Sequence, residues 1–386
     1  MVGKTAGTGG SEMTTIINWM GGWPKEGLVA ASEWEERLAA AASEQKSGAA
    51  SPVRKESESD SELRAAIAGD LLPGSGINEG AGLLVLVSGA DAAIGKLAER
   101  LLSPGDVVLT EKLTSRSVLQ LLRKAGVRIV PVGGDREGMN PEALQEALSI
   151  HRPRLVYAAP SCTDPEGAAW NKERLASAIR LCRKAGVLML RDDRQELIRY
   201  GKKDLNLRSG VREEAGVLSV GQLPPGLVGG LKFGWVAGTS EDMERWLPPQ
   251  VQAELQPTSL ERAALAALLR EQPLSPLLDM LNVQCGRKMR RLTELLALSQ
   301  VPKLTWVSPE GGIHLWLTLP PALDGEALLR GAWLKGLMFQ PGTPFYATEP
   351  QRNTVRLTFA FADDRQMKAG AARLIEAMGE FLGRSM

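Results

Sequence analysis

Short apolar runs alternate with amphipathic segments of helical spacing between residues 82 and 240. The runs that predict strands are Leu83–Val87, Asp106–Thr110, Val127–Val132, Leu155–Ala159, Val187–Leu190, Gly216–Val220 and Gly234–Ala237. The segments between them that predict helices are Asp91–Leu102, Ser117–Ala125, Pro141–Leu148 and Lys172–Ala185. Because apolar strands flanked by helices are covered on both faces, this part of the chain predicts a mostly parallel sheet in an α/β domain.

The pattern changes near Pro248, where the amphipathic segments become longer. Helices are predicted at Ser259–Arg270, Leu277–Ser299, Glu326–Lys335 and Arg365–Leu382, and strands at Thr305–Val307, Ile313–Leu319 and Val355–Phe361. This mixture predicts a smaller α+β domain. Since 386 residues is long for one hydrophobic core, we expect two lobes.

The N-terminal part of the chain is more polar than the alternating region after it. Residues 1–12, rich in Gly and Thr, predict a flexible tail or an expression remnant, and residues 13–63 an N-terminal segment. Within that segment Ser32–Ala42 has helical spacing with Ser32 as N-cap, whereas Ser43–Ser61 has almost nothing to bury and predicts a mobile loop. We expect residues 64–255 to form the large domain and residues 256–386 the small one.

Composition narrows the class of protein. Forty-four per cent apolar and 24% charged residues are typical of a soluble globular protein, and no apolar run reaches the ~20 residues of a membrane span. A formal net charge of +1 provides no field for nucleic acid or an anionic membrane. Two histidines argue against a metal site. With no leader sequence and three widely spaced cysteines that predict buried hydrophobes in a reducing compartment, we expect a cytoplasmic location.

Eight segments, in order along the chain, resemble the motifs of fold-type I pyridoxal-phosphate (PLP) aminotransferases. They are Ser88–Ala93, Pro104–Val108, Ala159–Gly167, Arg191–Arg194, Gly221–Trp235, Pro309–Trp316, Gln340–Tyr346 and Asn353–Ala360. The resemblance runs from about Ile16 to Leu382 and is closest to the aminotransferase-like domain of MocR-type regulators and to aminoadipate-type aminotransferases. It implies the aspartate aminotransferase-like fold and a homodimer, because fold-type I sites form between two subunits.

The resemblance gives cofactor-binding roles to Gly89, Ala90, Asp164 and Asp192. Gly89 and Ala90 match the turn whose N–H groups face the cofactor phosphate, although the same turn is also typical of a plain helix start capped by Asp91. Asp192 matches the carboxylate that pairs with the pyridine nitrogen, and an Asp after a strand also caps loops. Asp164 replaces an Asn that donates to the phenolic oxygen, and an ionised carboxylate only accepts.

Other positions on the cofactor side depart further from the family pattern. Pro225 stands in the position of the Schiff-base lysine, and proline has no amine. Ser115 replaces the aromatic residue that stacks on the cofactor ring, and Arg194 replaces the tyrosine that contacts the phenolic oxygen. Lys232 replaces the arginine that binds the phosphate, and a lysine meets a phosphate only as a point charge.

Arg356 keeps its family position. There it implies a clamp on the substrate α-carboxylate, and the alternative is a structural ion pair. His314, in the Gly-Gly strand motif, is interpreted as a packed strand residue. The turns that define the fold are therefore retained, while the changes gather on positions that would face the cofactor.

The sequence supports three hypotheses about function. The first is an aminotransferase-fold protein that has lost the Schiff-base lysine and is non-catalytic or repurposed, binding a partner or a small carboxylate or phosphate ligand in the old cleft. PLP is then not held covalently, or no cofactor is bound. The second is an active aminotransferase with a displaced lysine such as Lys232. The third, a DNA-binding regulator, is weak because neither a winged helix nor a basic patch is visible.

Overall fold

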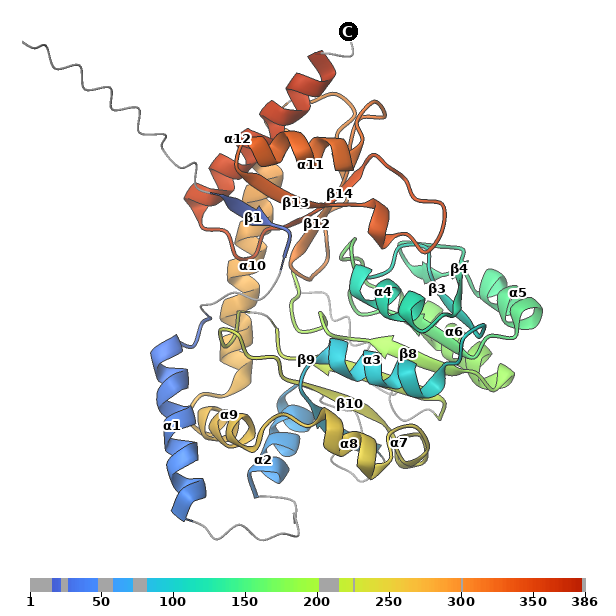
Figure 1. The fold of residues 1–386 in the computed structure, drawn as a ribbon, viewed down its shortest axis with the longest axis vertical. Helices are drawn as coiled ribbons and strands as arrows, with labels where there is room; N and C mark the ends of the chain where they lie inside the picture. Colours follow the sequence, from blue (N-terminus) through green and yellow to red (C-terminus); the bar gives the residue numbers. More distant parts are fainter. Residues whose placement is uncertain are drawn as a thin grey trace, which may run out of the picture.

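Two β-sheets, each covered by helices, organise the chain (Figure 1). The computed structural model describes residues 16–21, 27–47, 58–71, 82–200, 215–224, 226–299 and 301–383. The predicted tail at residues 1–12 and Pro225 lie outside these ranges. None of the helices in the described ranges has the length and apolar character that crossing a bilayer requires.

The larger sheet has the strand order β2-β10-β9-β8-β7-β3-β4. Its strands are β2 (Gly82–Val87), β3 (Val107–Glu111), β4 (Arg128–Val132), β7 (Leu155–Ala158), β8 (Leu188–Asp192), β9 (Val217–Gln222) and β10 (Gly234–Thr239). Only β10 runs antiparallel to its neighbours, β2 and β9. The prediction of a mostly parallel sheet is confirmed.

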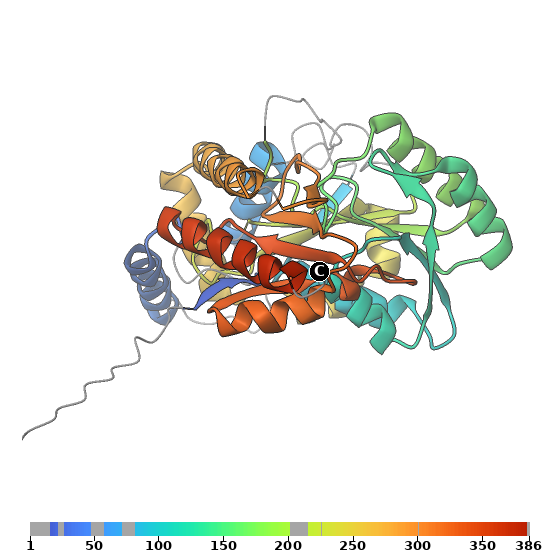
Figure 2. The same ribbon diagram turned by 90° about the horizontal axis from the view of Figure 1, so that it is seen from above.

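Apolar side chains project from both faces of this sheet, as is expected of strands buried on two sides. One face packs on α3 (Ala90–Leu101), α4 (Arg116–Lys124), α7 (Ser240–Trp246) and α8 (Pro249–Leu255). The opposite face packs on α5 (Pro141–His151) and α6 (Lys172–Ala185), and nearer β2 on α1 (Ala31–Ser47), α2 (Glu58–Ala66) and α9 (Ser259–Glu271). Helices α1 and α5 therefore lie at opposite ends of the molecule in both views (Figures 1 and 2).

The smaller sheet has the order β1-β13-β14-β12-β11. Its strands are β1 (Ile17–Trp19), β11 (Thr305–Trp306), β12 (His314–Thr318), β13 (Leu337–Pro341) and β14 (Thr354–Thr358). Helices α10 (Leu274–Ala297), α11 (Gly325–Leu334) and α12 (Asp364–Gly383) cover it, and Figure 2 shows α11 and α12 side by side. The sequence predicted neither β13 nor the parallel pairing of β1 with it.

Trp19 anchors the N-terminal strand in the small lobe. Its side chain is fully buried, and a Cβ atom added to Gly370 of α12 would lie only 2.4 Å from the Trp19 ring. Helix α10 in turn joins the two lobes, because Leu274 and Leu278 pack with the large sheet while Leu281 and later residues pack with the small one. The division of domains between residues 255 and 256 stays a prediction, although α9 shares its hydrophobic cluster with the large sheet.

Several remaining elements differ from the expectations. Helix α1 begins at Ala31 and continues to Ser47, so Ser32 lies inside the helix and is not its N-cap. The predicted loop starts too early, because Ser43 and the residues after it extend α1, and Ser43 Oγ donates to Ala39 O. Residues 48–57 lie outside the described ranges. A π-helical turn (Ile67–Leu71), a β5–β6 hairpin (Gly134–Asp135, Gly138–Met139) and a 3₁₀ turn (Thr343–Phe345) complete the structure.

Candidate functional site

A cavity of about 420 Å³ lies where the large sheet meets the small lobe. The N-terminal turns of α3 and α4, the end of β8 and the strands β12 and β14 surround it. Its polar and charged lining residues are Asp91, Ser115, Arg116, Ser117, Gln120, Asp164, Arg194, Gln195, Gln222, Lys232, His314, Gln340 and Arg356. The carboxyl edge of a mostly parallel sheet is where ligands of α/β proteins bind, so this cavity is the candidate site.

Helix α3 starts at the cavity, and the N–H of its first residue already has a hydrogen-bond partner. Gly89 has φ +103°, a conformation that L side chains rarely adopt, and it directs the first turn of the helix toward Gln222. The backbone N–H of Ala90 donates to Gln222 Oε1 at 2.8 Å. A neutral amide oxygen thus stands where the helix N-terminus would favour an anion. The predicted phosphate contacts of Gly89 and Ala90 stay predictions, and they require Gln222 to move.

Asp192 lies at the end of β8, between a tyrosine and an arginine. Tyr157 OH donates to its Oδ2 at 2.6 Å, and Arg194 Nε donates to its Oδ1 at 2.8 Å. Arg194 Nη1 reaches on to Asp91 Oδ1 at 2.6 Å, and Ser117 Oγ donates to the same oxygen at 3.0 Å. One guanidinium therefore joins β8 to the first turn of α3.

The charge on this arginine changes how its neighbours ionise. Partial desolvation by its neighbours raises the pKa of Asp91 although the side chain is 61% exposed, but the charge of Arg194 and the hydrogen bonds from Arg194 and Ser117 outweigh it, so the net pKa is lowered. Burial followed by the negative charge of Asp192 raises the pKa of Tyr157 well above its usual value. Tyr157 is therefore a neutral hydrogen-bond donor at any physiological pH.

Arg356 on β14 is paired inside the protein. Its Nη1 lies 2.6 Å from Asp164 Oδ1, its guanidinium carbon lies 4.6 Å from the centre of the Phe345 ring, and the side chain is 9% exposed. Gly21, with φ +111°, closes the other side, since a Cβ there would lie 3.5 Å from Arg356 Nη2. The two roles considered for Arg356 were a clamp on a substrate carboxylate and a structural ion pair. These contacts are those of a structural ion pair.

His314 is buried on β12 and faces the same cavity. Its Nδ1 lies 2.9 Å from Thr358 Oγ1, and burial together with the charge of Arg356 lowers its pKa to about 3. The ring is therefore neutral near pH 7. It acts as a packed strand residue that also forms part of the cavity wall.

Lys232 lines the same cavity as Arg356. Its side chain is exposed, and its Cβ lies 3.4 Å from the position of a Cβ added to Gly89. Its charge also helps to lower the pKa of Asp91. Pro225 lies outside the described residues, and the segment on either side of it connects β9 to β10, with Leu223 N donating to Phe233 O at 2.8 Å.

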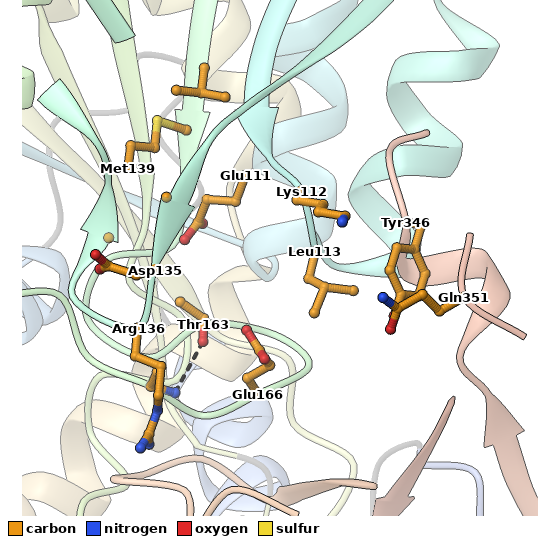
Figure 3. Close-up of a pocket in the computed structure, with 14 residues that line it drawn as sticks. Glu111, Lys112, Leu113, Asp135, Arg136, Met139, Thr163, Glu166, Tyr346 and Gln351 are labelled. Atoms are coloured by element: carbon orange, nitrogen blue, oxygen red, sulfur yellow. Dashed lines mark hydrogen bonds between the residues drawn. The ribbon is translucent and has the colours of Figure 1, made fainter. Parts of the chain in front are cut away.

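A second cavity of about 270 Å³ lies beyond the strand end of β3. Figure 3 shows the carboxylates of Glu111 and Glu166 on opposite sides of this space. Trp170 Nε1 donates to Glu111 Oε1 at 2.8 Å, and Ala159 N donates to Oε2 at 3.0 Å. Burial raises the pKa of Glu111 to about 7 despite these bonds, and the negative charges of Glu166 and Asp192 add to the effect.

We expect the free energy of unfolding to fall as the pH rises from about 4.5 to about 7, because folded Glu111 keeps a proton that the unfolded chain releases. A pKa displaced from 4.5 to about 7 corresponds to a free energy of at most about 3–4 kcal/mol. Glu111→Gln should therefore be less dependent on pH in this range. Urea unfolding at about pH 5 and about pH 7.5 measures the difference, with the exposed Glu376→Gln as control. Equal pH dependence in Glu111→Gln and wild type would contradict a raised pKa.

For three residues that form hydrogen bonds at the main cavity, the sequence predicted no role. Gln222 lies in a recognised motif and Tyr157 on a buried strand, but neither was singled out. Arg194 was interpreted only as the replacement of a tyrosine. A usable signal was present, because Asp91 and Arg194 have opposite charges and lie in two motifs of the same family site. The structure brings these two residues together as an ion pair.

The arrangement of a large, mostly parallel sheet, a small lobe and a cavity at the carboxyl edge defines an aspartate aminotransferase-like protein. The solved α-aminoadipate aminotransferase LysN of Thermus thermophilus, complexed with N-(5'-phosphopyridoxyl)-L-leucine, superposes with a TM-score of 0.84 and 25% identity, covering 96% of this chain and 93% of that one. The multiple substrate aminotransferase of Thermococcus profundus gives a TM-score of 0.82 at 21% identity, over 97% and 93% of the two chains.

Sequence comparison identifies the family of the chain. Residues 33–374 match the model of the class I and II aminotransferases, and the chain belongs to this family. The 2-aminoadipate transaminase of Thermus thermophilus is 26% identical over 298 residues, 76% of this chain and 75% of its own length. The uncharacterized HTH-type transcriptional regulator YisV of Bacillus subtilis is 24% identical over 325 residues, 84% of this chain and 66% of its own length. The predicted resemblance is confirmed.

The family implies PLP, and three contacts test the fit of that cofactor. The phosphate position at α3 requires Ala90 N, which donates to Gln222. The pyridine position requires Asp192, which is paired with Arg194. The substrate carboxylate position requires Arg356, which is paired with Asp164. These contacts do not fit a cofactor bound as the family binds it.

Proposed function

We propose that this chain is an aminotransferase-fold protein without Schiff-base chemistry. Its main cavity, which corresponds to the active-site cleft of the family, binds a small anionic ligand non-covalently. The observation that supports the proposal is that the protein's own side chains already engage three groups that the family pattern assigns to cofactor and substrate. Gln222 accepts from Ala90 N, Arg194 pairs with Asp192 and Asp164 pairs with Arg356.

Proline in the lysine position supports the same proposal. The ring nitrogen of a proline inside the chain is a tertiary amide without a hydrogen atom, so it offers no amine to an aldehyde. The chemistry of transamination needs both the amine and the pairing of the pyridine nitrogen. Losing both removes the covalent anchor and the electron sink together.

The charge of the cavity supports an anionic ligand. Arg116, Arg194, Lys232 and Arg356 line it against the carboxylates of Asp91 and Asp164, and His314 is neutral. The lining therefore carries a positive excess that favours carboxylate or phosphate groups. The homodimer is retained as a proposal from the family, and the cytoplasmic location and the absence of nucleic-acid and membrane partners as proposals from the composition.

Incubation with PLP followed by borohydride reduction tests this function. We expect no visible-region aldimine band that saturates at one PLP per chain, and no lysine that carries more phosphopyridoxyl group than exposed lysines far from the cleft, because the cleft provides no amine in register with the cofactor. The 2-aminoadipate transaminase of Thermus thermophilus is the positive control. A reduced adduct at Lys232, together with amino-acid turnover that Lys232→Ala abolishes, would establish the alternative of a displaced lysine.

A further inference from the structure

Arg356 is the best-formed carboxylate site in the cavity, and a carboxylate of the chain already occupies it. Asp164 Oδ1 lies 2.6 Å from Arg356 Nη1. The arginine is 7% exposed, and its Nε is buried without a hydrogen-bond partner among the described residues. A guanidinium can hold a carboxylate through two parallel N–H groups, so the single contact with Asp164 leaves part of its binding capacity unused.

A rigid turn holds Asp164 against this arginine. Gly167 N donates to Thr163 O at 2.7 Å, and Thr163 N donates to Ala168 O at 2.8 Å. Thr163 Oγ1 also accepts from Ala168 N at 3.0 Å, and Glu310 N closes the turn from the small lobe by donating to Gly167 O. A carboxylate fixed in this way has a high effective concentration at Arg356, which a free ligand must exceed.

Both partners face the cavity, so an incoming molecule meets them together. Asp164, Arg356 and His314 line the same space. Burial raises the pKa of Asp164, but the charge of Arg356 and the hydrogen bond that it donates outweigh burial, so the net pKa is lowered and the group is ionised at neutral pH. A ligand carboxylate therefore finds Arg356 neutralised and meets a negative charge beside it.

We propose that Asp164 is a built-in competitor for the carboxylate position on Arg356, so that a carboxylate ligand binds there only by displacing the Asp164 side chain. The inference rests on the proposed function, because it treats the cleft as a non-covalent binding site. It makes Asp164 the residue that sets the affinity of the cleft for carboxylates. Removing its charge opens a site that the wild-type protein keeps closed.

Chemical rescue tests the proposal with propionate as the probe. Asp164→Ala should lower the melting temperature, and propionate should restore it along a saturable curve, with at least about tenfold higher affinity than for the wild-type protein. Propionamide, which has the same shape and no charge, should have no effect. In Asp164→Ala combined with Arg356→Met, propionate should lose its effect because the receptor group is gone.

The chain provides a matched control in the Arg262–Asp60 pair between α9 and α2. Its N–O distance is 2.5 Å and its side chains are 9% and 11% exposed, against 9% and 12% for Arg356 and Asp164. Asp60→Ala should lose stability similarly and gain nothing from propionate. Equal rescue of both variants would overturn the proposal, because propionate would then fill any vacant carboxylate position.

Two further outcomes decide the matter. If propionate binds wild type as tightly as Asp164→Ala, Asp164 does not compete and the proposal is wrong. If Asp164→Ala does not fold, Asp164→Asn keeps the shape without the charge, and calorimetric titration with propionate should then show the gain in affinity. The failure of this inference leaves the proposed function intact, whereas an aldimine in the wild-type protein overturns the proposed function regardless of propionate.

Discussion

Asp193→Asn is expected to lower the free energy of unfolding by about 3–5 kcal/mol, because it leaves a buried arginine without its counter-charge. Arg191 and Asp193 form an ion pair at 3.2 Å with both side chains fully buried. Ser161 and Ser219 donate to the two oxygens of Asp193. Arg191 Nε and Nη1 have no hydrogen-bond partner among the described residues, so the carboxylate is its main compensation.

The position of this pair explains the size of the effect. Arg191 and Ser219 lie on the same face of the large sheet as Met189 and Val217, which belong to an apolar cluster. An unpaired guanidinium there has no route to water. Urea unfolding measures the loss, and Asp364→Asn, which removes a carboxylate 65% exposed, is the control and should change stability far less. Equal losses in Asp193→Asn and Asp364→Asn would contradict the argument.

Arg194→Met is expected to lower the free energy of unfolding by about 2–4 kcal/mol near pH 7. The substitution keeps most of the side-chain volume and removes the cation that joins β8 to α3. Asp192, which is 4% exposed, would keep only the hydrogen bonds from Tyr157 and from the backbone N–H of residue 194. Asp91 would lose its ion pair, at a small cost because its side chain is 61% exposed.

The effect of this substitution should depend on pH in a known direction. The pKa of Asp91 is lowered in the folded protein, so its ionisation contributes stability above its usual pKa of 3.8, and this stability is lost as the pH falls through the folded value. Arg194→Met removes the main cause of that lowering. The difference from wild type should therefore shrink below about pH 4.

Arg291→Met is the matched control for Arg194→Met. Arg291 also lies between two carboxylates, of Glu294 and Asp364, each at 3.5 Å, but these are 63% and 65% exposed. We expect a change of less than about 1 kcal/mol for the control. Equal losses in the two variants would mean that the cavity arginine contributes no more than a surface arginine.

The strands of the large sheet could be predicted because each is a short apolar run in a region where such runs alternate with helical segments, even β4 at the sheet edge, which is only partly buried. Strand β13 was missed because Leu337–Pro341 is short, alternates between buried and half-buried positions, and ends in proline. The pairing of β1 with β13 was also missed. No local pattern relates Ile17 to Leu337, since only the packed small lobe brings these residues together.

The sequence alone determined the family, the mostly parallel sheet and the changed positions of the cofactor site. These features are local, because a turn or a buried run can be recognised from the residues that form it. Only the tertiary structure decided what the changed residues do. Asp164 meets Arg356 across 192 residues, Asp91 meets Arg194 across 103, and Ala90 meets Gln222 across 132. Charges so far apart in the chain pair only when the fold fixes their distance, because electrostatic attraction depends on separation in space and not on order along the chain.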